Sequence, residues 1–328
     1  MIKIIYPNNK TKICLFTDMQ KSFLECDRSD MSAEDFDYLN LKKHEHPDYS
    51  IGKCIMFEWE PKCNAKLRIS ESAEFNDCII AFGDGCCEIY NLKPSTTYFA
   101  QVSTSEFESD VISFETEDAF PRFLNIDGVT NARDVGGTRN IDGIMVKYGM
   151  LYRGSEMNSH MTISEKGLKC MNDDLKIKSI LDLRGSAELV EDVYKHNYIH
   201  ISNSAYTKYL EEKEINKRIF DFLSVKENYP IYMHCWGGAD RTGTVAFMLG
   251  LILREDLKVL IDDYELTSLS IWGNRSRNKE NFRNFFDKLN SFEGDTIYDK
   301  AITFMLECGI SQNQINQIRN IMFEESHV

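Results

Sequence analysis

The sequence predicts an α/β domain, with a mostly parallel central sheet flanked by helices, preceded by a small all-β sandwich domain. A chain of 328 residues exceeds one typical domain. Before residue 118, short segments rich in β-branched and aromatic residues are separated by turn-forming residues, whereas strand-like and helix-like segments alternate after it. Such alternation requires crossover connections, which produce parallel strands. We therefore predict a first domain at 1–118 and a second at 119–328.

The strands predicted in the first domain partly alternate in polarity and are separated by Asn, Gly, Asp and Pro. They are 54–59, 65–70, 98–103 and 111–116. The stretch from Leu92 through Pro94 to Tyr98 resembles part of a fibronectin type III module, in which a Leu-x-Pro corner precedes a core tyrosine. The resemblance implies an immunoglobulin-like sandwich. An irregular insert at 26–50 interrupts the pattern, and we expect a loop or a short helix there.

The second domain is predicted to alternate buried strands with helices and to contain one long apolar helix. The strands are 179–183, 198–202 and 231–233, and the helices are 187–194, 208–225 and the segment that follows Arg241. Open α/β sheets bind ligands at the carboxyl ends of their strands. The segment that follows the strand 231–233 is therefore the expected site.

The formal net charge of −14 argues against non-specific binding to nucleic acid or to anionic membranes, because both are polyanions. No run approaches the roughly eighteen uninterrupted apolar residues of a membrane span. The first fifteen residues lack the continuous apolar core of a signal peptide. We expect a cytoplasmic protein that does not insert into membranes.

The ten cysteines are thinly spread, which favours reduced thiols over a disulfide framework. Cys86 and Cys87 form the closest pair, and no two close doublets have the spacing of a zinc site. His44 and His46 could act as ligands, but a solvated surface pair fits the polar insert better. We predict neither a metal nor another cofactor.

The most informative segment places Cys235 and Arg241 at the two ends of a glycine-containing turn, between an apolar strand and an apolar helix. Five residues between them let the backbone wrap a small tetrahedral anion, toward which the following helix points its positive N-terminus. A thiol in that environment ionises easily and becomes a nucleophile. The predicted phosphate-binding residues are Trp236, Gly237, Gly238, Ala239, Asp240 and Arg241.

The order His-Cys-x-x-Gly-x-x-Arg-Thr, from His234 to Thr242, resembles the signature of the protein tyrosine phosphatase superfamily at every defined position. Further motifs are similar to those of a microbial tyrosine/lipid phosphatase subgroup, and this resemblance extends from about Asn131 to Glu324. They are Asn131-Ala-Arg-Asp-Val-Gly-Gly137, Asp142-Gly143, Leu151-Tyr-Arg-Gly-Ser155, and Asp182-Leu-Arg184 with Glu188. Ala239 stands where that subgroup has a lysine associated with the extra phosphates of inositol lipids, which argues against a lipid substrate.

Residue chemistry assigns the reaction to the two ends of this turn. Cys235 attacks phosphorus and forms a thiophosphate intermediate, and Arg241 binds two non-bridging oxygens in its planar fork. Gly237 and Gly238 permit a close backbone approach. Thr242 can donate its hydroxyl to the sulfur or cap the helix. His234 is interpreted as a structural hydrogen-bonding neighbour rather than a proton shuttle.

The leaving group needs a proton. Many tyrosine phosphatases supply it from an aspartate on a separate loop, but the corresponding stretch here, 202–209, holds no Asp or Glu. Asp240 is the best candidate, and the resembling subgroup has an aspartate at the same position. The alternative role of Asp240 is to cap or brace the turn. Asp182 and Glu211 are weaker candidates for the proton donor.

Several charged residues in the matched motifs are candidates for support of the site or for substrate contact. Buried charges need partners, so an Arg–Asp scaffold is one interpretation and direct substrate binding is the other. The candidates are Arg133, Asp134, Arg153, Asp182 and Arg184.

The function predicted from these residues is hydrolysis of phosphomonoesters, protein phosphotyrosine above all, through a cysteinyl phosphate. A phosphoinositide or dual-specificity phosphatase, a rhodanese-like sulfurtransferase and a phospho-ligand binding module remain as alternatives. The expected partner is a phosphorylated protein, a small phosphomonoester or a phosphoinositide. The first domain lacks a cluster of catalytic residue types, so we expect it to be non-catalytic and to contact a protein partner.

Overall fold

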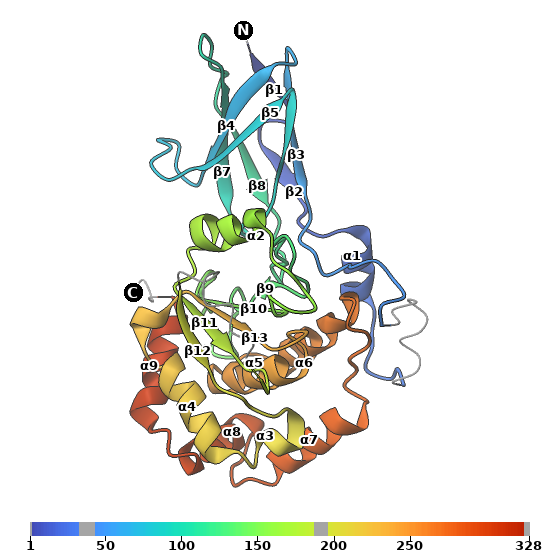
Figure 1. Ribbon diagram of the computed structural model, residues 1–328, viewed down its shortest axis with the longest axis vertical. Coiled ribbons are helices and arrows are strands. Elements are labelled where there is room, and N and C mark those ends of the chain that lie inside the picture. Colours follow the sequence, from blue (N-terminus) through green and yellow to red (C-terminus); the bar gives the residue numbers. More distant parts are fainter. Residues whose placement is uncertain (1, 33–42, 187–195, 325–328) are drawn as a thin grey trace. The chain divides into compact units, whose positions relative to one another are not determined.

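The computed structural model describes residues 2–32, 43–186 and 196–324. The chain forms two compact units (Figure 1). One unit consists of Met1–Lys21 with Gly52–Asn125, and the other of Ser22–Ile51 with Ile126–Val328. The division differs from the predicted boundary at 118, because the first unit continues to Asn125 and the insert at 26–50 belongs to the second.

The first unit contains two sheets whose buried side chains form one hydrophobic core. The three-stranded sheet has the order β1 (Lys3–Tyr6), β3 (Ile55–Glu60), β6 (Cys86–Ile89). The five-stranded sheet has the order β2 (Thr11–Ile13), β8 (Ile112–Thr116), β7 (Thr97–Ser103), β4 (Asn64–Ser70), β5 (Ile79–Asp84). Neighbouring strands are antiparallel except β2 and β8, which are parallel. The four strands predicted in this region correspond to β3, β4, β7 and β8.

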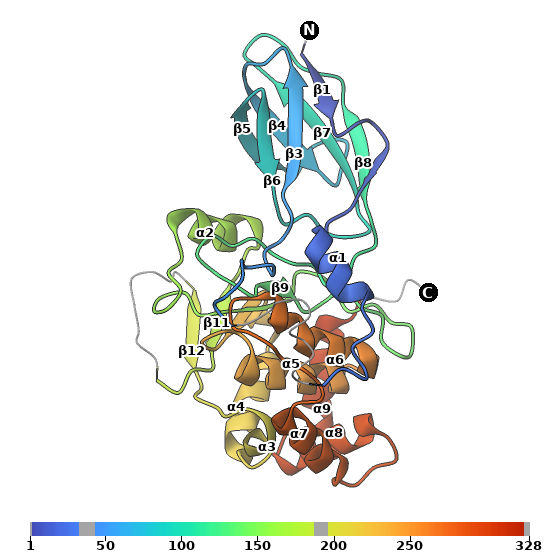
Figure 2. The ribbon, with the colours of Figure 1, turned by 90° about the vertical axis from the view of Figure 1, so that its right-hand side faces the viewer.

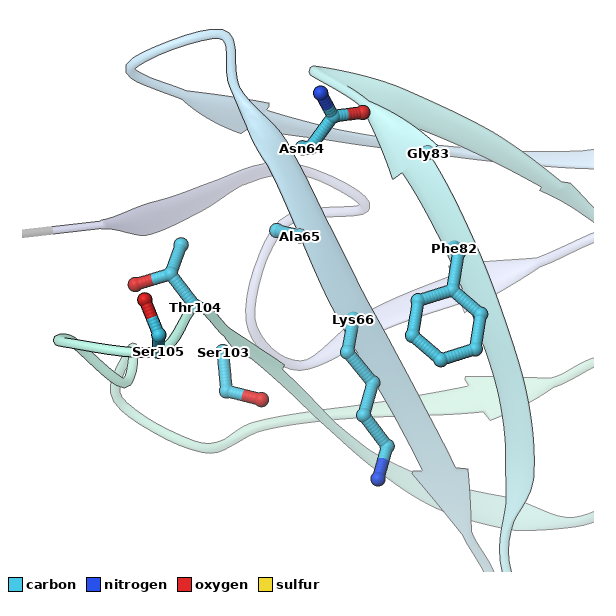
Figure 3. Close-up of a pocket in the computed structure, with 8 residues that line it drawn as sticks. All are labelled: Asn64, Ala65, Lys66, Phe82, Gly83, Ser103, Thr104 and Ser105. Carbon is cyan, nitrogen blue, oxygen red and sulfur yellow. The ribbon is translucent and has the colours of Figure 1, made fainter.

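A pocket in this unit is lined by polar and small side chains from β4, β5 and the turn after β7 (Figure 3). The lining residues are Asn64, Ala65, Lys66, Phe82, Gly83, Ser103, Thr104 and Ser105. Lys66 is the one charged residue among them, and they include no Cys, His, Asp or Glu. Its lining therefore offers hydroxyl groups and one ammonium group, but no thiol, imidazole or carboxylate.

The second unit is built on a five-stranded sheet in the order β12 (Asn197–His200), β11 (Ser179–Asp182), β13 (Ile231–His234), β10 (Leu151–Gly154), β9 (Arg133–Asp134). The first four strands are parallel and β9 runs antiparallel to β10. The sheet is therefore mixed: it is mostly parallel, and the antiparallel strand β9 at its edge was not predicted. Strands β10, β11 and β13 are buried along their whole length, which explains their short, nearly continuous apolar runs.

Helices cover both faces of this sheet, with α2 on one side and α4, α5 and α8 on the other (Figures 1 and 2). The helices are α1 (Asp18–Glu25), α2 (Glu165–Lys169), α3 (Tyr206–Tyr209), α4 (Lys213–Leu223), α5 (Asp240–Ile252), α6 (Leu257–Glu265), α7 (Glu280–Asn290), α8 (Ile297–Glu307) and α9 (Gln312–Met322). Short turns of other helix types are η2 (Cys170–Asp174), η3 (Lys226–Asn228) and η4 (Leu266–Leu269). No helix in the described ranges is both long and apolar enough to span a bilayer.

The helix predicted at 208–225 is two helices, α3 and α4, with a break before Lys213. At the break, the carboxylate of Glu212 accepts hydrogen bonds from the N–H and the hydroxyl of Ser204, which precedes α3, at 2.8 and 2.6 Å. The backbone of Glu212 leaves the helical region to make them. The helix predicted at 187–194 lies outside the described residues.

We expect the two phenylalanines Phe57 and Phe82 of the first unit to differ sharply in their contribution to its stability. Phe57 is fully buried in the core and Phe82 is 74% exposed on β5. Phe57→Ala should lower the free energy of unfolding by about 3–5 kcal/mol, because it removes core contacts and leaves a cavity. Phe82→Ala should change it by less than about 0.5 kcal/mol. Denaturant unfolding measures both, and equal losses would contradict the described core.

Candidate active site

The segment Cys235–Arg241, here called the cradle, connects the central strand β13 to the buried helix α5. His234, the last residue of β13, pairs in register with Gly154 of β10 and Asp182 of β11. The cradle therefore begins at the carboxyl end of the sheet, between two parallel neighbours. Cys235 is 4% exposed. The sheet thus delivers the thiol to the place where open α/β sheets bind ligands.

Three carbonyl oxygens of the cradle accept hydrogen bonds from residues outside it. The carbonyl of Gly237 accepts a hydrogen bond from Asn131 Nδ2 at 2.9 Å, and that of Gly238 accepts one from Arg153 Nη2 at 2.7 Å. The carbonyl of Trp236 accepts a backbone N–H at 2.9 Å. Three successive carbonyl groups are therefore held by donors outside the cradle.

The N–H groups of the same backbone are left without partners. None of the amides of residues 236–241 donates a hydrogen bond to another residue in the described part of the chain. Gly237, Gly238 and Ala239 are buried, and buried backbone N–H groups in proteins are nearly always paired. A cluster of unpaired donors beside a helix N-terminus is the arrangement that binds an anion.

Both glycines of the cradle are required by close contacts. Gly238 has φ of +63°, and a Cβ there would lie 2.1 Å from the carbonyl oxygen of Gly154. A Cβ on Gly237 would lie 2.7 Å from the ring of Trp272. Side chains at these positions would push the cradle away from β10 or displace the Trp272 ring.

Arg241 lies in the first turn of α5 and keeps most of its donors available. Its Nη1 donates to the carbonyl of Leu183 at 3.3 Å, just beyond the end of β11. It forms no ion pair with a carboxylate among the residues that the structure describes. A partly exposed guanidinium with free N–H groups can bind two oxygens of a tetrahedral anion in a fork.

Asp240 accepts three hydrogen bonds. Arg275 donates to its two oxygens from Nε at 2.8 Å and from Nη2 at 2.9 Å, and the hydroxyl of Tyr206 donates to Oδ1. Although burial opposes the shift, Arg275 and Tyr206 hold the pKa of Asp240 below its usual value. Tyr206 itself has φ of 57°, a strained conformation for an aromatic residue. Sequence reasoning did not identify either partner.

Asp182 belongs to a buried network below the cradle. Arg184 donates to Oδ1 from Nε at 3.0 Å and to Oδ2 from Nη2 at 2.7 Å, and Tyr198 donates to Oδ2 at 2.6 Å. The guanidinium of Arg184 also lies 5.2 Å from the ring centre of Trp236. Asp182 is therefore occupied as an acceptor. Glu211, the other weak candidate for a proton donor, is on the surface and pairs with Lys288 at 2.6 Å.

His234 is buried, and burial lowers its pKa, so the ring is neutral. Its Nδ1 lies 3.2 Å from the carbonyl oxygen of Cys235, which can only accept, so Nδ1 carries the proton. Thr242 is also fully buried. Its Oγ1 makes no hydrogen bond within the described residues, the Cys235 sulfur included. Neither side chain therefore forms a hydrogen bond with the sulfur of Cys235.

A buried triad of charges supports the cradle from behind. Asp263 on α6 binds Arg133 Nε at 2.6 Å and Arg153 Nη1 at 2.5 Å. Burial raises the pKa of Asp263, but the two guanidiniums outweigh it and hold the carboxylate charged. Arg133 also donates to Asn131 Oδ1 at 2.6 Å. The two residues that contact the cradle carbonyls are therefore connected through one carboxylate.

Asp134 is separate from this triad. Its oxygens accept hydrogen bonds from the N–H groups of Gly136 at 3.0 Å and Gly149 at 2.8 Å, so it shapes the turn between β9 and β10.

Sequence reasoning missed Asp263, which lies on a helix without a motif. Asn131 stood inside a quoted motif, but no role was assigned to it. No group of three or more His, Cys, Asp or Glu side chains in the described ranges is placed to hold a metal ion.

Comparison with known proteins gives three findings. The family model for the tyrosine phosphatase family matches residues 124–324, and no curated protein matches the chain. The core catalytic domain of the PP-IP phosphatase SIW14 from S. cerevisiae, solved with citrate, has 17% identity and a TM-score of 0.33, over 44% of this chain and 89% of that one. A second structure of the SIW14 catalytic core has 15% identity and a TM-score of 0.34, over 48% and 93%. Because the family model covers more than half of the 328 residues and contains the whole cradle, this chain belongs to the tyrosine phosphatase family.

Proposed function

We propose that this protein hydrolyses phosphomonoesters, with protein phosphotyrosine as its main substrate, through a cysteinyl-phosphate intermediate. The observation that carries the proposal is the set of unpaired backbone N–H groups from 236 to 241, which lies between the thiol of Cys235 and the available guanidinium of Arg241. Such a site binds a tetrahedral dianion and presents a nucleophile to it.

In the first step the thiolate of Cys235 attacks phosphorus. The S–P bond forms, the P–O bond to the leaving group breaks, and the leaving oxygen takes a proton. Arg241 and the cradle N–H groups bind the non-bridging oxygens, on which negative charge is spread in the transition state. In the second step a water molecule gives up a proton and attacks phosphorus. The P–S bond then breaks, and inorganic phosphate and the thiolate are released.

Asp240 is the proposed proton donor in the first step and acceptor in the second. It is the acidic side chain inside the cradle, and Asp182 and Glu211 are bound elsewhere. The ion pair with Arg275 favours the carboxylate form of Asp240. The protonated form is therefore populated at acid pH, and we infer an acidic optimum for substrates with poor leaving groups.

Aromatic side chains beside the cradle favour an aryl phosphate. Trp272 lies against Gly237, and the ring of His160 lies 5.0 Å from that of Trp236 and 6.3 Å from that of Trp272. These rings suit the phenyl ring of phosphotyrosine. The cradle carries Ala239, buried and uncharged, where a lysine would assist a polyphosphorylated inositol.

The first unit is proposed to be a non-catalytic module of the fibronectin type III kind that contacts a protein partner. The buried Tyr98 supports the likeness, since its hydroxyl accepts the N–H of Lys93 at 2.9 Å, as in the tyrosine corner of related sandwiches. The lining of the pocket in this unit offers no thiol, imidazole or carboxylate, which supports the division of roles.

Cys235→Ser should abolish hydrolysis and leave anion binding, because a serine hydroxyl does not ionise here while the backbone donors remain. Assays with phosphotyrosine and phosphoserine peptides, a phosphoinositide panel and thiosulfate measure the activity, and titration with inorganic phosphate measures the binding. Release of phosphate from phosphotyrosine by the wild-type protein is the expected result. Turnover of thiosulfate alone would indicate a sulfurtransferase, and binding without turnover would indicate a recognition module.

Asp240→Asn should slow hydrolysis of a tyrosyl or alkyl phosphate by about 10²–10⁴-fold, which is the usual contribution of general acid catalysis. An ester whose leaving group is already a stable anion should lose much less, since it needs no proton. The ratio of kcat/KM for the two esters is the measurement. Equal losses for both would mean that Asp240 only braces the cradle.

Arg275→Gln should move the basic limb of the pH–rate profile to higher pH. Arg275 lowers the pKa of Asp240, so its removal lets the carboxyl group keep its proton at higher pH. Arg277→Gln is the matched control, because this arginine of the same loop pairs with Asp262 and Glu265 instead. A profile that shifts equally in both variants, or in neither, contradicts the role of the Arg275–Asp240 pair.

A further inference from the structure

The segment Lys43–Ser50, from the irregular insert, packs within the same compact unit as the cradle. Two backbone hydrogen bonds attach it to the region that follows α6. His44 N donates to the carbonyl of Ile271 at 3.0 Å, and Tyr49 N donates to that of Leu269 at 2.9 Å. The segment is therefore held at both ends against the loop that carries Trp272.

One end of the segment reaches the cradle through Asn131. Ser50 is 1% exposed, and its hydroxyl donates to Asp48 Oδ1 at 2.6 Å while it accepts the backbone N–H of Asn131 at 2.8 Å. The side chain of Asn131 in turn donates to the carbonyl of Gly237. Asn131 has φ of 57°, a conformation that asparagine tolerates better than most residues but that needs support from its surroundings.

The other end of the segment reaches the cradle through Trp272. The ring centres of His44 and Trp272 lie 5.8 Å apart in a T-shaped arrangement, and Lys43 Nζ lies 5.9 Å from the Trp272 ring centre. Gly273 has φ of +78°, and a Cβ on it would lie 2.7 Å from that of Lys43. The ring of Trp272 lies directly against Gly237.

We propose that Lys43–Ser50 is a brace that positions Gly237, with Ser50 and His44 as positioning residues for anion binding and catalysis. Two independent contacts of Gly237, its carbonyl and its α-carbon, are each supported by one end of this segment. When the Gly237 carbonyl is held outward, the next N–H stays available for the phosphate oxygens. The proposal rests on the proposed function only in taking the cradle as the anion site.

The first test compares Ser50→Ala, Ser50→Thr and the matched control Ser29→Ala in the full chain. Ser29 makes the same local turn with Asp27 that Ser50 makes with Asp48, but its hydroxyl does not accept the N–H of Asn131. Ser50→Ala should weaken binding of inorganic phosphate, measured by calorimetry, by about tenfold, as expected when a buried N–H loses its acceptor. Ser50→Thr keeps the oxygen and should restore affinity, and Ser29→Ala should leave it unchanged.

Phosphate binding is measured without turnover, so its outcome is separate from that of the proposed function. A wild-type protein that binds phosphate but hydrolyses nothing would overturn the function and leave the brace standing. Unchanged affinity in Ser50→Ala would overturn the brace. A loss in folded Ser50→Ala that folded Ser50→Thr does not restore would also overturn the role of the hydroxyl.

If Ser50→Ala fails to fold, the variant His44→Asn tests the proposed brace instead. His44 is exposed, and His44→Asn keeps a residue that tolerates its φ of 58° while it removes the ring contact with Trp272. We expect weaker phosphate binding, by about threefold to tenfold, the range for loss of one modest contact. The kcat/KM for a small aryl phosphate should fall in parallel, and an unchanged affinity would overturn the proposal.

Discussion

The geometry of the cradle depends on where its backbone carbonyl oxygens are held. The N–H and C=O groups of a planar trans peptide unit point in opposite directions, so holding the carbonyls of Gly237 and Gly238 behind the cradle turns the adjoining N–H groups away from the framework. Asn131 and Arg153 donate to these carbonyls. Arg153 binds Asp263, and Arg133 binds both Asp263 and Asn131, so the two donors belong to one network. The anion site is therefore a consequence of hydrogen bonds on the far side of the loop.

The same framework explains how a chain with a formal net charge of −14 can present a site for an anion. Arg133, Arg153, Arg184 and Arg275 each pair with a carboxylate near the cradle, whereas Arg241 pairs with none among the residues that the structure describes. Burial and the neighbouring Arg133 lower the pKa of Arg153 to about 10, which still leaves it protonated at neutral pH. The Arg241 guanidinium and the N-terminus of α5 create a positive potential close to the cradle, while the net charge of the chain acts at longer range.

The regular elements could be predicted wherever one local pattern decides them. The apolar runs of β11 and β13 and the alternation in β4 and β7 are such patterns. Three features could not be predicted this way. The antiparallel β9 is only two residues long, the break before α4 depends on a carboxylate that binds Ser204, and the segment Ser22–Ile51 belongs to a unit distant in sequence. Each depends on a non-local partner, which hydrophobic periodicity does not register.

The sequence by itself determined the position of the cradle and of its cysteine and arginine, because Cys235 and Arg241 are six positions apart and strand, turn and helix follow one another directly. Tertiary structure decided the protonation of Asp240, the support of Gly237 and the pairing of Arg153. Those depend on Arg275, Ser50 and Asp263, whose residue types are common on protein surfaces and carry no motif. These three residues acquire a role only when the fold brings them close to the cradle, where an unpaired charge or N–H group would be costly.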